Sequence, residues 1–199
     1  MKLLIASDIH GSAYWCRALM ARIEAESPDT IVLLGDLLYH GPRNDLPRDY
    51  APKEVLAMLN PLASRIVAVR GNCDSEVDQM VLDFPCMADY TLVVDSAPEA
   101  RKNAGLLAEA SPDGAADASA AGSPLTLFCT HGHLYGPQNV PPLARGSALL
   151  YGHTHVKEVA QRDGVLFVNP GSVSLPKDGS NSYAVYENGN FDLRELNGE

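Results

Sequence analysis

The sequence lacks long apolar runs of the kind that cross membranes. None of its apolar stretches reaches the roughly 18–20 residues that a membrane-spanning helix needs. The first segment becomes polar at Ser7 and Asp8, too early for the apolar region of a secretory signal peptide. We therefore expect a cytoplasmic protein that does not bind membranes.

Cysteine and positive charge are both scarce. The four cysteines are widely spaced and form no C-x-x-C pair, which excludes a zinc knuckle and a disulfide framework. The 15 Lys and Arg residues stand against 25 Asp and Glu residues, giving a formal net charge of −10. Nucleic acids and membrane surfaces are anionic, so this balance argues against a general binder of either. A few cations held at one site would still reverse the field locally.

Residues 96–123 lack large apolar side chains after Leu107 and are rich in Ala, Gly, Ser, Pro and Asp. Such a segment buries too little surface to offset the entropy lost on ordering. We predict a mobile insertion between two strands, with one helical turn near 104–110; a lid and a disordered insertion are the alternatives. The length of 199 residues fits one domain, 1–199, that carries this insertion.

The remaining sequence alternates apolar runs with helical patterns in its first half and is rich in strands in its second half. Ser12 is a candidate cap for a first helix, and the spacing of apolar residues predicts another helix over 53–62. Apolar runs predict strands at 2–7, 30–34, 66–69, 90–94, 125–129, 148–151, 156–161, 165–168, 183–186 and 191–196. The pattern predicts an α/β fold with two sheets packed face to face and helices outside.

Polar side chains follow five of these strands, where ligands gather in α/β sheets. Each motif alone is an ordinary turn or loop. Counted with His133, which lies two residues after His131, they hold five of the six histidines and leave only His40 outside. This clustering predicts a metal site made of Asp8, His10, Asp36, Asn72, His131, His153 and His155.

The types of these side chains indicate which metals bind and what they do. Oxygen and imidazole ligands without thiolates suit Mn²⁺, Zn²⁺ or Fe. One aspartate can bridge two ions, and two ions roughly 3.5–4 Å apart form a clamp for hydrolytic displacement at phosphorus. A water that bridges both ions would lose a proton readily and become the attacking hydroxide.

The motifs resemble the set found in the calcineurin-like metallophosphoesterases, and within them the small bacterial YfcE-type phosphodiesterases. The resemblance covers nearly the whole chain and lies in SDIHG (7–11), LLGDLLYHGPRN (33–44), GNCDSEVDQM (71–80), THGHLYGP (130–137), YGHTH (151–155) and NPGSVSLPK (169–177). It implies a four-layer αββα sandwich of two mixed β-sheets flanked by helices, with a dinuclear site. We expect two divalent ions, with Mn²⁺ preferred and Zn²⁺ or Fe as alternatives.

The resemblance also implies a role for each ligand. The first ion would take Asp8, His10, Asp36 and His155, and the second Asp36, Asn72, His131 and His153. Asp36 would then bridge the ions, and Asp36 and Asn72 would count among the catalytic residues.

Three further residues are candidates for substrate binding. Many family members carry His after Gly-Asn, where this chain has Cys73, as YfcE-type proteins do. We expect Cys73 to form a wall of the substrate pocket, with a direct acid role as the alternative. His133 would contact the phosphate or hydrogen-bond locally. Arg43 would contact the phosphate or remain a solvated loop cation.

The predicted function is metal-dependent hydrolysis of a small phosphodiester. A phosphomonoesterase and a cyclic-nucleotide phosphodiesterase are alternatives, since the metal ligands hold the phosphate and not its substituents. A scaffold like the retromer subunit of the same fold is a third alternative, though that relative lacks several histidine ligands that are intact here. A homodimer is the assembly that the resemblance suggests.

Overall fold

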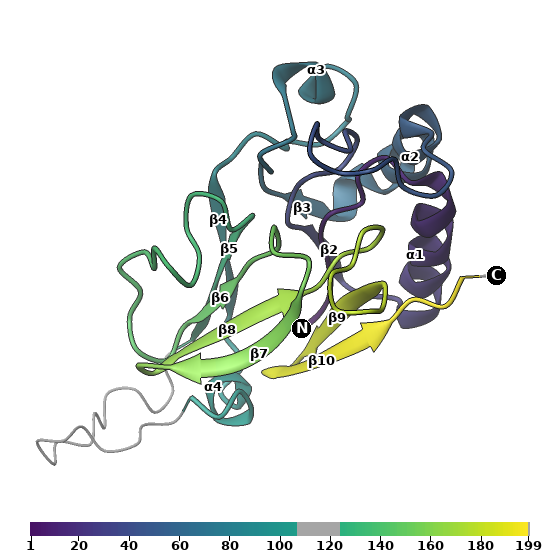
Figure 1. Ribbon diagram of the computed structural model, residues 1–199. Coiled ribbons are helices and arrows are strands. Elements are labelled where there is room, and N and C mark those ends of the chain that lie inside the picture. The colour runs from purple at the N-terminus through teal and green to yellow at the C-terminus, as the bar shows by residue number, and fades with distance from the viewer. Residues whose placement is uncertain (107–123, 199) are drawn as a thin grey trace, which may run out of the picture.

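The computed structural model describes residues 1–106 and 124–198, which form two five-stranded mixed sheets packed face to face (Figure 1). The first sheet has the order β10-β9-β1-β2-β3 and the second β4-β5-β6-β8-β7. The strands are β1 (Lys2–Ala6), β2 (Thr30–Leu33), β3 (Ile66–Ala68), β4 (Tyr90–Asp95), β5 (Leu125–Thr130), β6 (Ala148–Leu150), β7 (Lys157–Arg162), β8 (Val165–Pro170), β9 (Ser182–Glu187) and β10 (Asn190–Glu195). The helices are α1 (Ala13–Glu26), α2 (Pro52–Leu59), the 3₁₀ helix η1 (Asn60–Arg65), α3 (Glu76–Gln79) and α4 (Ala100–Asn103).

Helices α1 and α2 cover the outer face of the first sheet (Figure 1). The Ser12 side chain accepts a hydrogen bond from the Trp15 backbone N–H, so the expected cap begins α1. Apolar residues on one face of α1, including Leu19 and Ile23, pack with Leu4 of β1 in a buried cluster. The helix predicted over 53–62 is α2, continued by η1.

The space between the sheets holds a second apolar core. Alternate residues of β1, Leu3 and Ile5, point inward, because successive side chains of a strand face opposite sides. They share a cluster with Leu127 of β5 and Val168 of β8. Within each sheet, neighbouring strands of the site run parallel: β1, β2 and β3 in the first, β5, β6 and β8 in the second. Their carboxyl ends therefore lie together.

The outer face of the second sheet is covered by a loop in the part of the chain that the structure describes. Phe128, Leu149 and Phe167 form a separate apolar cluster on this face, and Tyr135 and Leu143 pack against it. Both come from the segment between β5 and β6. The two mixed sheets with helices are confirmed, and this loop occupies the place of the fourth layer.

The first part of the predicted insertion is described by the structure. A short helix, α4, lies at Ala100–Asn103, and Ala100 packs into the core between the sheets. The helical turn expected near 104–110 falls mainly on residues outside the described ranges. The predicted mobility of 96–123 falls mainly on residues 107–123, which lie outside the described residues. Among the described residues, no helix combines the length and the hydropathy of a membrane span.

Candidate metal centre

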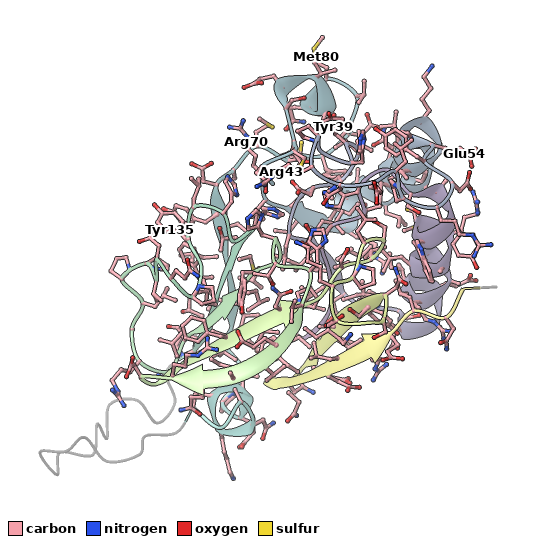
Figure 2. The ribbon with its side chains drawn as sticks, viewed as in Figure 1. Tyr39, Arg43, Glu54, Arg70, Met80 and Tyr135 are labelled. Carbon is pink, nitrogen blue, oxygen red and sulfur yellow. The ribbon has the colours of Figure 1, made fainter. Side chains whose placement is uncertain are left out.

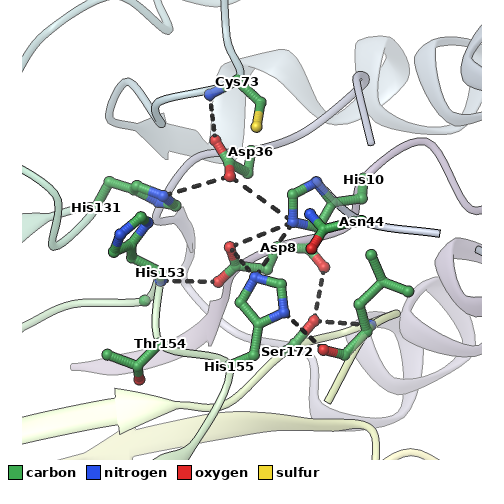
Figure 3. Close-up of polar contacts among 12 residues, drawn as sticks. Asp8, His10, Asp36, Asn44, Cys73, His131, His153, Thr154, His155 and Ser172 are labelled. Carbon is green, nitrogen blue, oxygen red and sulfur yellow. Dashed lines mark hydrogen bonds and ion pairs between the residues drawn. The ribbon is translucent and has the colours of Figure 1, made fainter. Parts of the chain in front are cut away.

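The structure brings the predicted ligands together where strands from both sheets end. Asp8 and His10 follow β1, Asp36 follows β2 and Asn72 follows β3, all in the first sheet. The second sheet contributes His131 after β5, with His153 and His155 after β6. Figure 3 shows these side chains, apart from Asn72, converging on one centre, with Asp8 and Asp36 between the histidines. Their role as ligands stays a prediction.

One group of ligand atoms surrounds Asp8. His155 Nε2 lies 3.1 Å and His10 Nε2 3.6 Å from Asp8 Oδ1, and the two Nε2 atoms are 3.3 Å apart. Ligands that share one ion, with bonds of about 2.1 Å, lie about 3–3.5 Å from one another. The group therefore has the spacing of one ion's ligands.

A second group surrounds Asp36. His131 Nε2 lies 3.4 Å from Asp36 Oδ2 and 3.1 Å from Asn72 Oδ1. The same oxygen, Asp36 Oδ2, is 3.7 Å from His10 Nε2, so it faces both groups. The other oxygen, Oδ1, accepts a hydrogen bond from the Cys73 backbone N–H at 2.8 Å. The His153 ring completes this side, with its centroid 5.1 Å from that of His131.

Three of the histidines have their tautomer fixed by backbone carbonyls, which only accept hydrogen bonds. Nδ1 donates to the carbonyl oxygen of a loop residue at 2.9 Å in His10, 2.7 Å in His131 and 2.6 Å in His155; the acceptors are Tyr39, Leu34 and Leu175. A neutral imidazole protonated at Nδ1 has a bare lone pair at Nε2. All three lone pairs point at carboxylates or at each other, an arrangement that repels unless a cation lies between them.

The charges of the site support the same reading. Burial raises the pKa of Asp8, but His10 and His155 outweigh it and hold that pKa well below its usual value. The pKa of His131 is lowered by burial, yet Asp36 and Asp8 raise it to about 9. Asp8 Oδ1 is buried without a hydrogen-bond donor. Two buried carboxylates with no Lys or Arg partner among the described residues fit divalent cations. Without such ions, protons on the neighbouring histidines would supply the positive charge.

Five of the predicted ligands have left-handed backbone conformations. The φ angles are +59° at Asp8, +49° at His10, +55° at Asp36, +64° at His153 and +60° at His155. Non-glycine residues avoid this region, at a cost of about 1–2 kcal/mol each. Backbone strain of this kind persists only where surrounding contacts enforce it, and it is common at functional sites.

A residue that the sequence analysis did not single out holds two of the loops together. The buried carboxylate of Asp74 accepts hydrogen bonds from the backbone N–H groups of Asp36 (2.8 Å), Leu37 (2.9 Å) and Gly71 (2.7 Å). It thus fixes the β2 and β3 loops to each other. One signal in the sequence could have identified Asp74: it is the only acidic residue in the short motif Gly-Asn-Cys-Asp.

The NPGS segment supports the site from the other side. Ser172 and Ser174 hydroxyls donate to the Asp8 carbonyl at 3.0 and 3.2 Å, and so stabilise its left-handed conformation. The Asn169 side chain donates to the Gly152 carbonyl and to Thr154 Oγ1, both at 2.9 Å, which holds the turn that carries His153. These contacts give the segment a structural role at the site.

The predicted substrate-binding residues divide between two hollows. Cys73 and Arg43 line a cleft of about 870 Å³ that opens over Asp36, His153 and His155. Burial, followed by the Asp36 carboxylate, raises the pKa of the Cys73 thiol to about 12, so the thiol stays protonated. His133 lines a neighbouring groove of about 650 Å³, which meets the cleft at His153. The buried His133 Nδ1 contacts no hydrogen-bond partner among the described residues.

Fold and site together define a metal-dependent phosphoesterase: two packed sheets with a carboxylate and histidine centre at their strand ends. The model of the calcineurin-like phosphoesterase superfamily domain matches residues 1–190, and the chain belongs to this family. It is 42% identical over 198 residues to the phosphodiesterase YfcE of Escherichia coli K12, covering 99% of this chain and 93% of that protein.

Solved structures agree. The structure of the E. coli phosphoesterase YfcE superposes with a TM-score of 0.78 at 39% identity, covering 99% of this chain and 100% of that one. Vps29 from Entamoeba histolytica, complexed with Zn²⁺, shares the fold with a TM-score of 0.54 at 17% identity, over 99% of this chain and 100% of that one.

Proposed function

We propose that this protein is a dinuclear-metal phosphodiesterase that hydrolyses small phosphodiesters. The observation that carries the proposal is the set of Nε2 atoms of His10, His131 and His155, held 3.1–3.7 Å from the buried carboxylates of Asp8 and Asp36. The relative YfcE is a phosphodiesterase by name, and its similarity extends over nearly the whole chain.

Each ion has its own ligand group in this proposal. The first is held by Asp8, His10, Asp36 and His155, and the second by Asp36, Asn72, His131 and His153. The position of Asp36 Oδ2 between His10 and His131 supports Asp36 as the bridge. The nitrogen and oxygen donors favour Mn²⁺, and Zn²⁺ or Fe fit the same set.

When bound, the ions supply Lewis-acid chemistry: they acidify the attacking water to hydroxide and neutralise charge on the phosphoryl oxygens. The chain's own residues orient the substrate. Arg43 reaches the phosphate from the cleft wall, and the Cys73 thiol shapes the pocket beside Asp36. A protonated thiol with a pKa near 12 is a weak proton donor, so leaving groups that need no protonation, such as aryloxides, react best.

The test is hydrolysis of bis-p-nitrophenyl phosphate by Mn²⁺-loaded protein and by Asp36→Asn. We expect the variant to lose at least about 10³-fold in kcat/KM, because removing the bridging carboxylate uncouples both ligand groups. Asp83→Asn, which changes an exposed carboxylate, should retain wild-type activity. An inactive wild-type protein that holds both ions would refute the proposal.

Substrate preference needs a second assay, because the ligands do not distinguish esters. Side-by-side turnover of bis-p-nitrophenyl phosphate and p-nitrophenyl phosphate should favour the diester, since the cleft and the adjoining groove offer room on both sides of His153. A higher kcat/KM for the monoester would make the protein a phosphomonoesterase instead.

A further inference from the structure

The outer part of the cleft carries two cations that the proposed chemistry does not fully use. Its volume of about 870 Å³ lies in the range of pockets that hold whole small molecules, well beyond one phosphoryl group. Arg43 and Lys177 are the Arg and Lys residues among its described lining. Figure 2 shows Arg43 beside Tyr39 at the end of the molecule that carries α3.

Lys177 is held in place by a metal-ligand histidine. Its backbone N–H donates to the His155 carbonyl at 2.9 Å, while the His155 ring donates from Nδ1 to the Leu175 carbonyl at 2.6 Å. Pro176 lies between these two contacts and restricts the backbone further. The base of the Lys177 side chain is therefore fixed relative to the proposed metal centre.

Arg43 is placed in a comparable way by the other histidine of the same group. His10 Nδ1 donates to the Tyr39 carbonyl at 2.9 Å, and the Asn44 side chain donates to the His40 carbonyl at 2.8 Å, which closes the loop around Arg43. The His10 and His155 Nε2 atoms are 3.3 Å apart. The loop that carries Arg43 is therefore hydrogen-bonded to His10, and the loop that carries Lys177 to His155. These two histidines are proposed ligands of the same ion.

No carboxylate in the described part of the chain neutralises either cation. Within the described residues, no Asp or Glu oxygen lies within 4.0 Å of the Arg43 or Lys177 head group. The acidic residue next to Lys177 in the sequence, Asp178, is paired elsewhere. It accepts from the Lys157 ammonium at 3.0 Å and from the Lys157 backbone N–H at 2.6 Å. In a chain with a net charge of −10, two unpaired cations on one cleft produce a local anion-binding field.

We propose that Lys177 binds a second anionic group of the substrate, beyond the phosphate that Arg43 reaches from the cleft wall, so that the preferred diester carries a further phosphoryl group. This inference rests on the proposed function, which places the phosphodiester group of the substrate at the metal centre. Lys177 would act in substrate recognition and not in the chemical step, so its effect should fall on KM.

The experiment compares two substrates that differ by one phosphate: thymidine 5′-(p-nitrophenyl phosphate), with and without a 3′-phosphate. The Mn²⁺-loaded wild type should prefer the 3′-phosphorylated compound by about tenfold in kcat/KM, mostly through KM, as expected for one charge-assisted contact. Lys177→Met should abolish the preference and Lys177→Arg should retain it. Lys53→Met, which removes an exposed lysine on α2, should leave it intact. No preference in the wild type, or an unchanged preference in Lys177→Met, overturns the inference.

A binding measurement separates this inference from the proposed activity. Calorimetric titration of the Mn²⁺-loaded protein with thymidine 3′,5′-bisphosphate and thymidine 5′-monophosphate requires no turnover. Tighter binding of the bisphosphate, lost in Lys177→Met and weakened at high salt, supports the second anion site even if neither ester is hydrolysed. Equal affinities overturn it even if both esters are hydrolysed.

Discussion

At the scale of single residues, the strained backbone conformations of the site orient the side chains of the predicted ligands. Asp8, Asp36 and His153 have φ angles near +60°, and the carboxylates of Asp8 and Asp36 face His155 and His131 from the other sheet's loops. The energetic cost is offset by specific contacts, such as the Ser172 hydroxyl on the Asp8 carbonyl. Contacts within the protein therefore position the predicted ligands, which would reduce the cost of ordering them around a metal.

The first prediction concerns Gly71, which packs directly against the proposed bridging carboxylate. A Cβ at this position would lie 2.1 Å from Asp36 Oδ1 and 2.3 Å from the Asp36 backbone nitrogen. Gly71→Ala should displace Asp36, lower kcat/KM by at least about 10²-fold and reduce the bound metal, measured by elemental analysis.

The matched control for this prediction is Gly105→Ala, whose added Cβ meets no atom of the described residues within 4 Å. It should bind metal as the wild type does, even though its φ of +69° makes alanine somewhat strained. Full metal occupancy and activity in Gly71→Ala would show that Asp36 does not have the role assigned to it.

At the scale of secondary structure, the strands and their polar ends were predictable because the pattern is local. The apolar runs that lead to the site are followed within three residues by a glycine or an aspartate. The Asp163-Gly164 and Asn188-Gly189 turns have the positive φ angles expected of hairpins. The clustering of the seven polar residues follows from parallel strands that end at one edge.

Other features carry no local signal. The acceptors that fix the histidine tautomers are backbone carbonyls of Tyr39, Leu34 and Leu175, and any residue type would supply them. The loop that covers Phe128 and Phe167 has no periodicity to reveal its packing. The anchoring role of Asp74 depends on the approach of two loops, which only the tertiary fold produces.

The second prediction concerns the end of α1, where Glu26 links the helix to the first sheet. Its carboxylate pairs with Lys2 at 3.0 Å and with Arg194. Burial raises the pKa of Glu26, but the opposite effect of Lys2 and Arg194 is larger, so the pKa lies below its usual value. A depressed folded pKa contributes stability above the unfolded pKa of about 4.3, and this stability is lost as the pH falls through the folded value.

Urea unfolding of Glu26→Gln should therefore show a free energy of unfolding lower than wild type by about 0.5–1 kcal/mol at pH 7, a size typical of partly solvated ion pairs. The difference should shrink as the pH falls below about 4. Glu24→Gln, at an exposed position on the same helix, should behave like the wild type at both pH values. A difference independent of pH would mean that Glu26 stabilises by packing alone.

At the scale of the whole molecule, the proposed ions connect the two sheets. The first sheet supplies Asp8, His10, Asp36 and Asn72, and the second supplies His131, His153 and His155. The direct polar links across this end include the His153 backbone N–H to Asp8 Oδ2 at 3.1 Å. Ions that bind only the folded chain should therefore stabilise the whole sandwich.

The third prediction follows from this linkage. Metal-free protein titrated with Mn²⁺ should gain about 2.7 kcal/mol at a free concentration of 100 times Kd, which raises Tm by roughly 5–10 °C in a chain of this size. Thermal unfolding followed by circular dichroism measures the shift. Asp36→Asn should lose most of it, and an equal shift in that variant would place the stabilising ions elsewhere.

Anomalous diffraction from crystals soaked in Mn²⁺ tests whether Asp36 bridges two ions. Two anomalous peaks should appear roughly 3.5–4 Å apart. One should lie among Asp8, His10 and His155, the other among Asn72, His131 and His153, with Asp36 contacting both. A single peak, or two peaks that Asp36 does not join, would contradict a bridged dinuclear centre.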